Sequence, residues 1–330
     1  MKVGVFWRKF RNVELQRKIS EENTYDDAYE EAFQHMTALQ EAGFDAELIE
    51  WRNNDPRKTL REVFSKGIDI VFNASSLREV AFLEAFDIPY VGSGIDLVAT
   101  NKATRKKILA FHQLPTPKFF VVKNSRSIPS HSLNYPLFAK PVSGRGSAGI
   151  SEENIVYNLK DLGRIVDKIA KKIGQDTLVE EFIDGREITV GVIGNEEPKV
   201  LPILEIQYNS AKTNTYEHKM LDREIIKCPA DLPKDIEDNI KETAVKIYKV
   251  LNVKDFGRID MILSKDGTPY FLEINTFAGL TMPKGKAHSG YMGYMAQAEG
   301  MSAAEFIGGI LQYAIKRYAL NEKRAYGLPS

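Results

Sequence analysis

The pattern of hydrophobic residues changes near residue 95, and this change restricts the folds that the chain can adopt. Before it, short apolar runs typical of buried strands alternate with segments of helical period; the strand candidates are residues 3–7, 46–49, 68–72 and 88–91. Strands that alternate with helices form parallel sheets with right-handed crossovers. We therefore predict an α/β unit at the start of the chain.

After residue 95 the strand-like segments follow one another in pairs. The strand candidates are residues 119–122, 136–140, 177–183, 187–193, 200–206, 257–263 and 270–275, and the helix candidates are residues 159–173, 233–250 and 302–317. A further helix is expected after Thr100 as its N-cap. Its four basic residues are interpreted as a solvated face: Lys102, Arg105, Lys106 and Lys107. This part of the chain predicts an α+β unit of two lobes.

Composition excludes several classes of protein. The chain has 45 Lys and Arg against 45 Asp and Glu, so no excess charge favours nucleic acid or an anionic membrane. No apolar run approaches the roughly 20 residues of a membrane helix, and the first run meets Arg8 too early for a signal peptide. The single Cys228 excludes an internal disulfide and favours a reducing compartment. We expect a cytoplasmic globular protein without nucleic-acid or membrane partners.

Residues 257–275 predict a hairpin that gathers four polar side chains. Asp266-Gly267 suits a two-residue turn, because both residues tolerate the positive φ angles of such turns. With that turn, Asp260 lies opposite Glu273, and Arg258 lies opposite Asn275. Side chains alternate along a strand, so these four share one face. The other face carries Ile259, Met261, Leu272 and Ile274.

Two carboxylates opposed across a strand pair repel each other, and a bound cation would turn the repulsion into attraction. The carboxylates of Asp260 and Glu273 and the amide oxygen of Asn275 are hard ligands that suit Mg²⁺ held together with a substrate phosphate. The alternative is a solvated face on which Arg258 pairs with the acids. A three-residue turn would shift the register and remove the basis of this prediction.

A glycine-rich segment, Gly144 to Gly149, matches the string G-x-G-x-x-G of dinucleotide-binding folds. That motif normally follows the first strand and opens a helix, whereas this one follows a mid-chain strand and precedes no helical pattern. We therefore disfavour an NAD-dependent oxidoreductase. The loop could instead fold over phosphates, with Lys140 as the charge behind it, or be an exposed hairpin tip.

Other reactive side chains lack the context of a nucleophile. The five histidines do not have the spacing of metal ligands, no serine lies in G-x-S-x-G, and Cys228 has no neighbouring histidine or second cysteine. The sequence therefore indicates no covalent enzyme intermediate.

Taken together, the motifs resemble those of the D-alanine–D-alanine ligase family of the ATP-grasp superfamily. The matching segments are collinear from about residue 88 to 315: Pro89 to Gly94 with Asn101-Lys102, Phe138 to Pro141, Gly146 to Ile150, Val179 to Glu187, Tyr216 to Lys219, Cys228 to Pro233, Arg258 to Asp260 and Leu272 to Thr276. The resemblance implies an ATP-grasp fold with an N-terminal Rossmann-like, pre-ATP-grasp parallel α/β domain. It implies domains at residues 1–98, 99–184 (central lobe) and 185–330 (C-terminal lobe with the Mg²⁺ site).

The resemblance also implies a reaction: ATP phosphorylates a substrate carboxylate, and an amine attacks the acyl phosphate through a tetrahedral intermediate. Phosphate contacts are implied for Lys102, Lys140, Ser147 and Lys219, adenine contacts for Glu180 and Ile183, and a ribose contact for Glu187. Asp260, Glu273 and Asn275 are implied as ligands of two Mg²⁺ ions, with Mn²⁺ as an alternative metal. Three catalytic groups are implied. Arg258 and the backbone N–H of Gly279 would stabilise the oxyanion, and Ser147 is the third.

The chain departs from the family where the family binds its amino acids. Residues 10–15 do not align with the family's first loop, residues 72–77 lack its His-Gly-rich segment, and Met220 replaces a tyrosine. About six residues, 282–287, are inserted before His288-Ser289, which resembles a substrate-contacting pair. We therefore expect a preferred pair other than two D-alanines, such as one with a larger or L-configured amino acid or a peptide-like acceptor. The hydroxyl that Met220 lacks could come from Tyr208, Tyr216 or Tyr291.

The expected partners are small-molecule amino acids, and the resemblance suggests a homodimer. The alternatives to a D-alanine–D-alanine ligase-like enzyme are an ATP-grasp ligase for another amino-acid or peptide-like substrate, an oxidoreductase, and a nucleotide-binding module without catalysis. The intact set of Lys140, Arg258, Asp260, Glu273 and Asn275 disfavours the last alternative.

Overall fold

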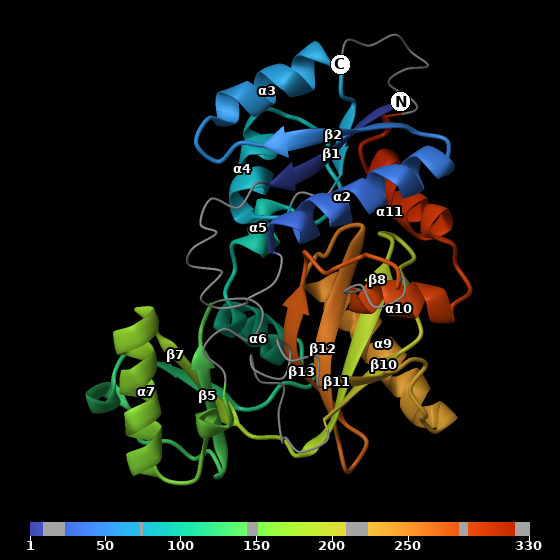
Figure 1. Cartoon of the computed structure of the whole chain (residues 1–330). Coiled ribbons are helices and arrows are strands. Elements are labelled where there is room, and N and C mark those ends of the chain that lie inside the picture. Colours follow the sequence, from blue (N-terminus) through green and yellow to red (C-terminus); the bar gives the residue numbers. More distant parts are fainter. Residues whose placement is uncertain (9–23, 73–74, 144–150, 209–223, 284–289, 321–330) are drawn as a thin grey trace.

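A computed structural model describes residues 1–8, 24–72, 75–143, 151–208, 224–283 and 290–320. Within these residues the strands form three sheets, one parallel and two antiparallel, each covered by its own helices (Figure 1). Among the described helices, none combines the length and the hydropathy that a membrane-spanning segment needs.

The first sheet is parallel, as the early alternation predicted. Its order is β2-β1-β3, from β1 (Lys2–Arg8), β2 (Asp45–Trp51) and β3 (Ile70–Phe72). The helices of this part are α2 (Thr24–Glu41), α3 (Pro56–Ser65), α4 (Leu77–Ala85) and α5 (Ile95–Val98). Residues 88–91, expected as a fourth strand, contribute only a single parallel bridge from Tyr90 to Val71.

The second sheet has the order β4-β7-β5-β6 and is antiparallel. Its strands are β4 (Phe119–Val122), β5 (Leu137–Pro141), β6 (Ile155–Val156) and β7 (Thr177–Glu181). Helix α7 (Leu159–Ile173) packs its apolar side on this sheet and ends at Gly174, whose φ of 70° suits a residue without a Cβ. Strands β4 and β5 are consecutive in the chain but do not pair with each other, because β7 lies between them.

The third sheet has the order β11-β10-β8-β12-β13, with β9 paired to β8, and every pair is antiparallel. Its strands are β8 (Gly185–Ile193), β9 (Lys199–Val200), β10 (Leu204–Tyr208), β11 (Glu224–Lys227), β12 (Phe256–Ser264) and β13 (Pro269–Asn275). Helix α9 (Lys234–Val250) packs on one face of this sheet. The strand expected over 200–206 is interrupted at residues 201–203, where Pro202 cannot donate a ladder hydrogen bond.

Helix α6 (Lys102–Phe111) joins the first part of the chain to the other two sheets. Its N-cap is Asn101, whose side chain accepts a hydrogen bond from the Thr104 N–H, so the expected cap at Thr100 is one residue early. Leu109 of α6 is fully buried in the same core as α9 and β12.

The last two helices, α10 (Tyr291–Ala298) and α11 (Ala303–Arg317), return the chain to its start. Helix α11 lies beside α2 (Figure 1), and a Cβ on Gly308 would lie only 2.8 Å from the Cβ of Ala42. Buried side chains of α2, β1, α10, α11 and β10 form one continuous core. The parallel sheet and the third sheet are therefore joined by shared hydrophobic packing.

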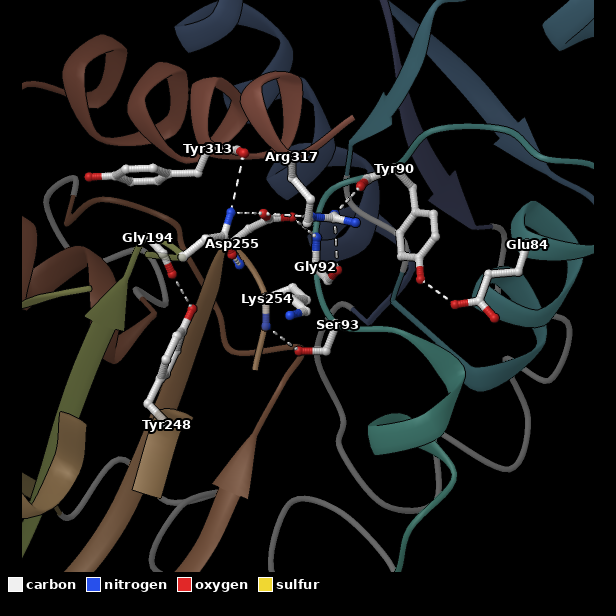
Figure 2. Close-up of polar contacts among 11 residues, drawn as sticks. Glu84, Tyr90, Gly92, Ser93, Gly194, Tyr248, Lys254, Asp255, Tyr313 and Arg317 are labelled. Atoms are coloured by element: carbon white, nitrogen blue, oxygen red, sulfur yellow. Dashed lines mark hydrogen bonds and ion pairs between the residues drawn. The ribbon is translucent and has the colours of Figure 1, made fainter. Parts of the chain in front are cut away.

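A buried ion pair strengthens this junction (Figure 2). Asp255 is fully buried, and its two oxygens lie 2.6 Å and 3.1 Å from Nη2 and Nε of Arg317 on α11. The same carboxylate accepts a hydrogen bond from the Gly92 N–H at 2.8 Å and another from the Asn195 side chain at 2.9 Å. Arg317 also donates to the carbonyl of Tyr90 at 2.8 Å. One acidic side chain thus connects three segments that are distant in sequence.

We expect Arg317→Met to lower the free energy of unfolding by about 3 kcal/mol or more, because Asp255 would stay buried without its counter-charge. Denaturation in urea measures the change. The matched control is Lys316→Met on the same helix, which breaks the exposed pair with Glu196 and should leave stability nearly unchanged. Equal losses in the two variants would contradict this account of the junction.

Candidate active site

The hairpin of β12 and β13 brings the four predicted polar residues together. Arg258 pairs with Asn275, and Asp260 pairs with Glu273, as the sequence predicted. The turn itself is different: Ser264 and Thr268 close a three-residue loop, in which Gly267 has a φ of 82°. The predicted pairing survives because a β-bulge on β13 shifts the register back before Glu273 is reached.

Because of the bulge, the side chains on the inner face of the hairpin differ from those predicted. Phe271 lies opposite Met261 and is fully buried, whereas Leu272, expected in the core, is the extra residue and is only half-buried. The apolar face is therefore formed by Phe271 and Ile274 on β13 and by Ile259 and Met261 on β12.

Arg258 and Asp260 form a bidentate ion pair on the polar face. Nε and Nη2 of Arg258 each lie 2.9 Å from an oxygen of Asp260, and the Thr189 hydroxyl donates to the same carboxylate at 2.6 Å. Arg258 is only 8% exposed. The alternative of a solvated face is thus wrong for Arg258, and its pairing of Arg258 with an acid is correct.

A third side chain completes this arrangement and was underestimated from the sequence. The ring of Tyr291 lies over the guanidinium of Arg258, with 4.9 Å from Cζ to the ring centroid, and its hydroxyl donates a hydrogen bond to Glu224. From the sequence, Tyr291 is expected only as a source of a hydroxyl. No local signal marks the stacking, because Tyr291 and Arg258 are 33 positions apart in the chain.

The basic residues of α6 lie along β13, and the prediction of a solvated basic face is wrong for three of the four. Lys102 Nζ lies 3.4 Å from a carboxylate oxygen of Glu273. Arg105 donates to the carbonyl of Ile274 at 3.0 Å, and Lys106 donates to that of Phe271 at 3.0 Å. Only Lys107 is exposed.

Lys106 also reaches the second sheet, where it shares Glu180 with Lys140. The two Nζ–carboxylate distances are 2.9 Å and 2.6 Å, and all three side chains are buried. Burial alone would raise the pKa of Glu180, but the two ammonium groups outweigh it and hold that pKa below its ordinary value. Burial lowers the pKa of Lys106 to about 8. One carboxylate is therefore shared by two ammonium groups between the second and third sheets.

The donor set on the hairpin fits a metal that is shared with a phosphate. Within the described ranges, no group of three or more His, Cys, Asp and Glu side chains is arranged to hold a metal by itself. Asp260 and Glu273 supply two carboxylates, and Asn275 adds an amide oxygen, which also accepts the Phe277 N–H at 3.1 Å. Two carboxylates that leave further positions to phosphate oxygens are typical of Mg²⁺ sites.

The other predicted site residues are only partly described. Ile183 follows β7, Glu187 lies on β8 next to Ile206 of β10, and Gly279 follows β13 by four residues. Ser147, Lys219, His288 and Ser289, with Met220 and the Gly144–Gly149 loop, fall outside the described residues. Their roles and those of the other site residues stay predictions.

Glu180→Gln is expected to lower the free energy of unfolding by about 3 kcal/mol or more, because it leaves two buried lysines without their anion. The loss should be present above pH 4.5, the ordinary pKa of the carboxyl, and should diminish as the pH falls through the depressed pKa of the folded state. Urea denaturation between pH 3 and 8 measures it. The control is Glu181→Gln at the half-buried neighbouring position, which should lower the free energy of unfolding much less.

Comparisons with known proteins identify relatives of this chain. The family model described as D-ala D-ala ligase C-terminus matches residues 108–312. The chain is 34% identical to a D-alanine–D-alanine ligase of Bordetella petrii over 84% of both chains. It is 32% identical to D-alanine–D-alanine ligase B of Clostridium perfringens over 72% of this chain and 76% of that one.

Solved structures agree on the fold. A D-alanine–D-alanine ligase from Bacillus anthracis complexed with ATP has a TM-score of 0.72 and 21% identity, covering 97% of this chain and 99% of that one. The VanG D-Ala:D-Ser ligase from Enterococcus faecalis also has a TM-score of 0.72, with 22% identity over 95% of this chain and 99% of that one. The predicted ATP-grasp fold is thereby confirmed. The family model and the relatives above 30% identity together establish that the chain belongs to the D-alanine–D-alanine ligase family.

Proposed function

We propose that this protein is an ADP-forming ligase that uses ATP to join the carboxylate of one amino acid to the amine of another. The observation that carries the proposal is the polar face of the β12–β13 hairpin, where Arg258, Asp260, Glu273 and Asn275 lie together beside Lys102. Family membership supports the same reaction class, since the relatives from Bordetella petrii and Clostridium perfringens are named as ligases.

The proposed nucleotide site lies between the second and third sheets. Lys102 and Lys140 are the cations for the phosphates. Lys102 on α6 lies beside Glu273 of the hairpin, and Lys140 on β5 lies beside Glu180, which supports this role. Glu180 and Ile183 border the adenine in this proposal, and Glu187 accepts the ribose hydroxyls. Ser147 and Lys219 are proposed as further phosphate contacts on the family resemblance alone.

Asp260, Glu273 and Asn275 would hold Mg²⁺ in this proposal. The metal, when bound, neutralises the phosphoryl oxygens during transfer. The chain's own contribution is to fix the two carboxylates before any ligand arrives: Arg258 and Thr189 hold Asp260, and Lys102 lies next to Glu273.

In this reaction the protein must stabilise one oxyanion, and it does not need to supply a nucleophile. The substrate carboxylate takes a phosphoryl group, and the amine attacks the resulting acyl phosphate with loss of phosphate. Arg258 and the N–H of Gly279 are proposed to bind the oxyanion of the tetrahedral intermediate. Burial raises the pKa of the Cys228 thiol to about 11, so this free cysteine stays protonated and unreactive at neutral pH.

The remaining proposals concern location and assembly. We place the protein in the cytoplasm, where a single free cysteine stays reduced. Amino acids are its proposed small-molecule partners, and a homodimer is proposed on family resemblance.

Glu273→Gln should lower kcat about 100-fold or more, because it removes one of the two charges that are proposed to hold the metal and the phosphoryl group. The assay is Mg²⁺-dependent release of ADP and phosphate in the presence of amino acids. Formation of AMP and pyrophosphate would contradict the proposed chemistry. Glu242→Gln, on the exposed side of α9, is the control and should behave as the wild type.

The preferred amino acids are expected to differ from a simple pair of D-alanines. Met220, the shortened segment after β3 and the insertion at 282–287 each alter a part that binds amino acids in the family. Loss of a polar partner in such a site relaxes or redirects substrate choice. The measurement is kcat/KM for D-alanine with itself and with a panel of D- and L-amino acids and dipeptides. A tenfold or greater preference for two D-alanines would refute this expectation.

A further inference from the structure

We infer that the start of α10 is the positioning element of the reaction centre, because its N-cap Gly290 and its first residue Tyr291 fix the two groups proposed to bind the oxyanion, Gly279 and Arg258. This inference rests on the proposed function and adds two positioning residues to it. Neither is proposed to touch the reacting atoms.

Gly290 packs directly on the backbone of Gly279. A Cβ at Gly290 would lie 2.1 Å from the carbonyl oxygen of Gly279, closer than any van der Waals contact allows. The Gly290 N–H also donates to the carbonyl of Thr281 at 3.1 Å. Gly293 repeats the close approach one turn later, since a Cβ there would lie 2.0 Å from that same Thr281 oxygen. The absence of side chains therefore lets α10 support the segment that carries the Gly279 N–H.

The opposite side of α10 rests on the third sheet. A Cβ on Gly191 of β8 would lie 2.8 Å from Sδ of Met295, so the helix approaches the sheet closely at this point. Met292 and Met295 are fully buried in the shared core. The helix is consequently held from both sides, and its first turn has a fixed position relative to β12.

Tyr291 uses that fixed position to hold Arg258. Two nitrogens of the guanidinium are bound to Asp260, and the Tyr291 ring covers one of its faces at 4.9 Å. The remaining nitrogen, Nη1, has no hydrogen-bond partner among the side chains and backbone that the structure describes. The in-plane contacts and the stacking together leave the guanidinium one orientation, with Nη1 available to a ligand.

Glu224 prevents the Tyr291 ring from turning away. Burial raises the pKa of the phenol, and the Glu224 carboxylate raises it further, so the hydroxyl stays protonated and donates to that carboxylate. Donors that are preorganised at an oxyanion act mainly on the transition state, so a loosened Arg258 should lower kcat and leave ATP binding intact.

The test compares Tyr291→Leu, Tyr291→Phe and the control Tyr313→Leu. Tyr313 is a half-buried tyrosine of α11 that packs on the same core away from Arg258. We expect Tyr291→Leu to lower kcat for phosphate release about tenfold, with KM for ATP within twofold of the wild type. It should also weaken about tenfold the binding of a phosphinate dipeptide, which mimics the tetrahedral intermediate. Tyr291→Phe keeps the ring and should lose about threefold in kcat, and Tyr313→Leu should keep the wild-type value.

The outcomes separate the inference from the function on which it rests. If wild-type protein releases no phosphate with any amino acid, the proposed function fails and the inference fails with it. If wild-type protein is active and Tyr291→Leu keeps its kcat, only the inference is overturned. If Tyr291→Leu does not fold, Tyr291→Phe decides: a kcat equal to the wild type, or a loss of ATP affinity instead of kcat, overturns the inference.

Discussion

Strand β12 is hydrogen-bonded along both edges, to β8 over nine residue pairs and to β13, and the site depends on those two registers. The register with β13 places Asp260 opposite Glu273. The register with β8 places Asp260 beside Thr189, whose hydroxyl donates a hydrogen bond to the Asp260 carboxylate. Side chains on a strand reverse their direction with every one-residue shift, so a slip of either neighbour would separate the polar groups. The bulge on β13 is part of this constraint, because it restores the pairing after a three-residue turn.

Each carboxylate of the site has a neighbouring cation before any ligand binds. The opposed carboxylates of Asp260 and Glu273 would weaken a bare strand pair, yet each has a cation from a different element: Arg258 on β12 and Lys102 on α6. Lys106 extends the pattern to Glu180 in the second sheet and to a backbone carbonyl of β13. Buried charges are tolerated only when they are paired in this way. Lys106, which links the second and third sheets, thus lies on the same helix as Lys102, which is proposed to contact the phosphates.

Features set by local spacing were predictable from the sequence, and features set by tertiary contacts were not. Helices α7 and α11 and the pairing of Asp260 with Glu273 follow from periodicity, caps and turn residues. The pairing was nevertheless predicted through a two-residue turn that does not exist, and the bulge cancelled the error. The basic side of α6 looked solvated because helical period alone does not reveal that β13 lies against it. Helix α10 was missed because Gly290 and Gly293 lower helix propensity, and the close packing that requires them involves residues 279–282.

The division between what holds the chemistry and what selects the amino acids has a physical basis. Arg258, Asp260, Glu273, Lys102 and Gly279, which are proposed to act in phosphoryl transfer and oxyanion binding, lie on β12, β13, α6 and the segment after β13, where hydrogen bonds and close packing fix the backbone. The departures expected from the family resemblance are at residues 10–15, 72–77, 220 and 282–287. Changes in connecting segments alter which side chains meet a substrate without moving a packed hairpin. Tyr291 lies between the residues proposed for the chemistry and the segments expected to differ from the family. It follows residue 287 by four positions, and its ring stacks on Arg258. A change in amino-acid preference can therefore arise in the inserted segment while the first turn of α10 keeps the arginine in place.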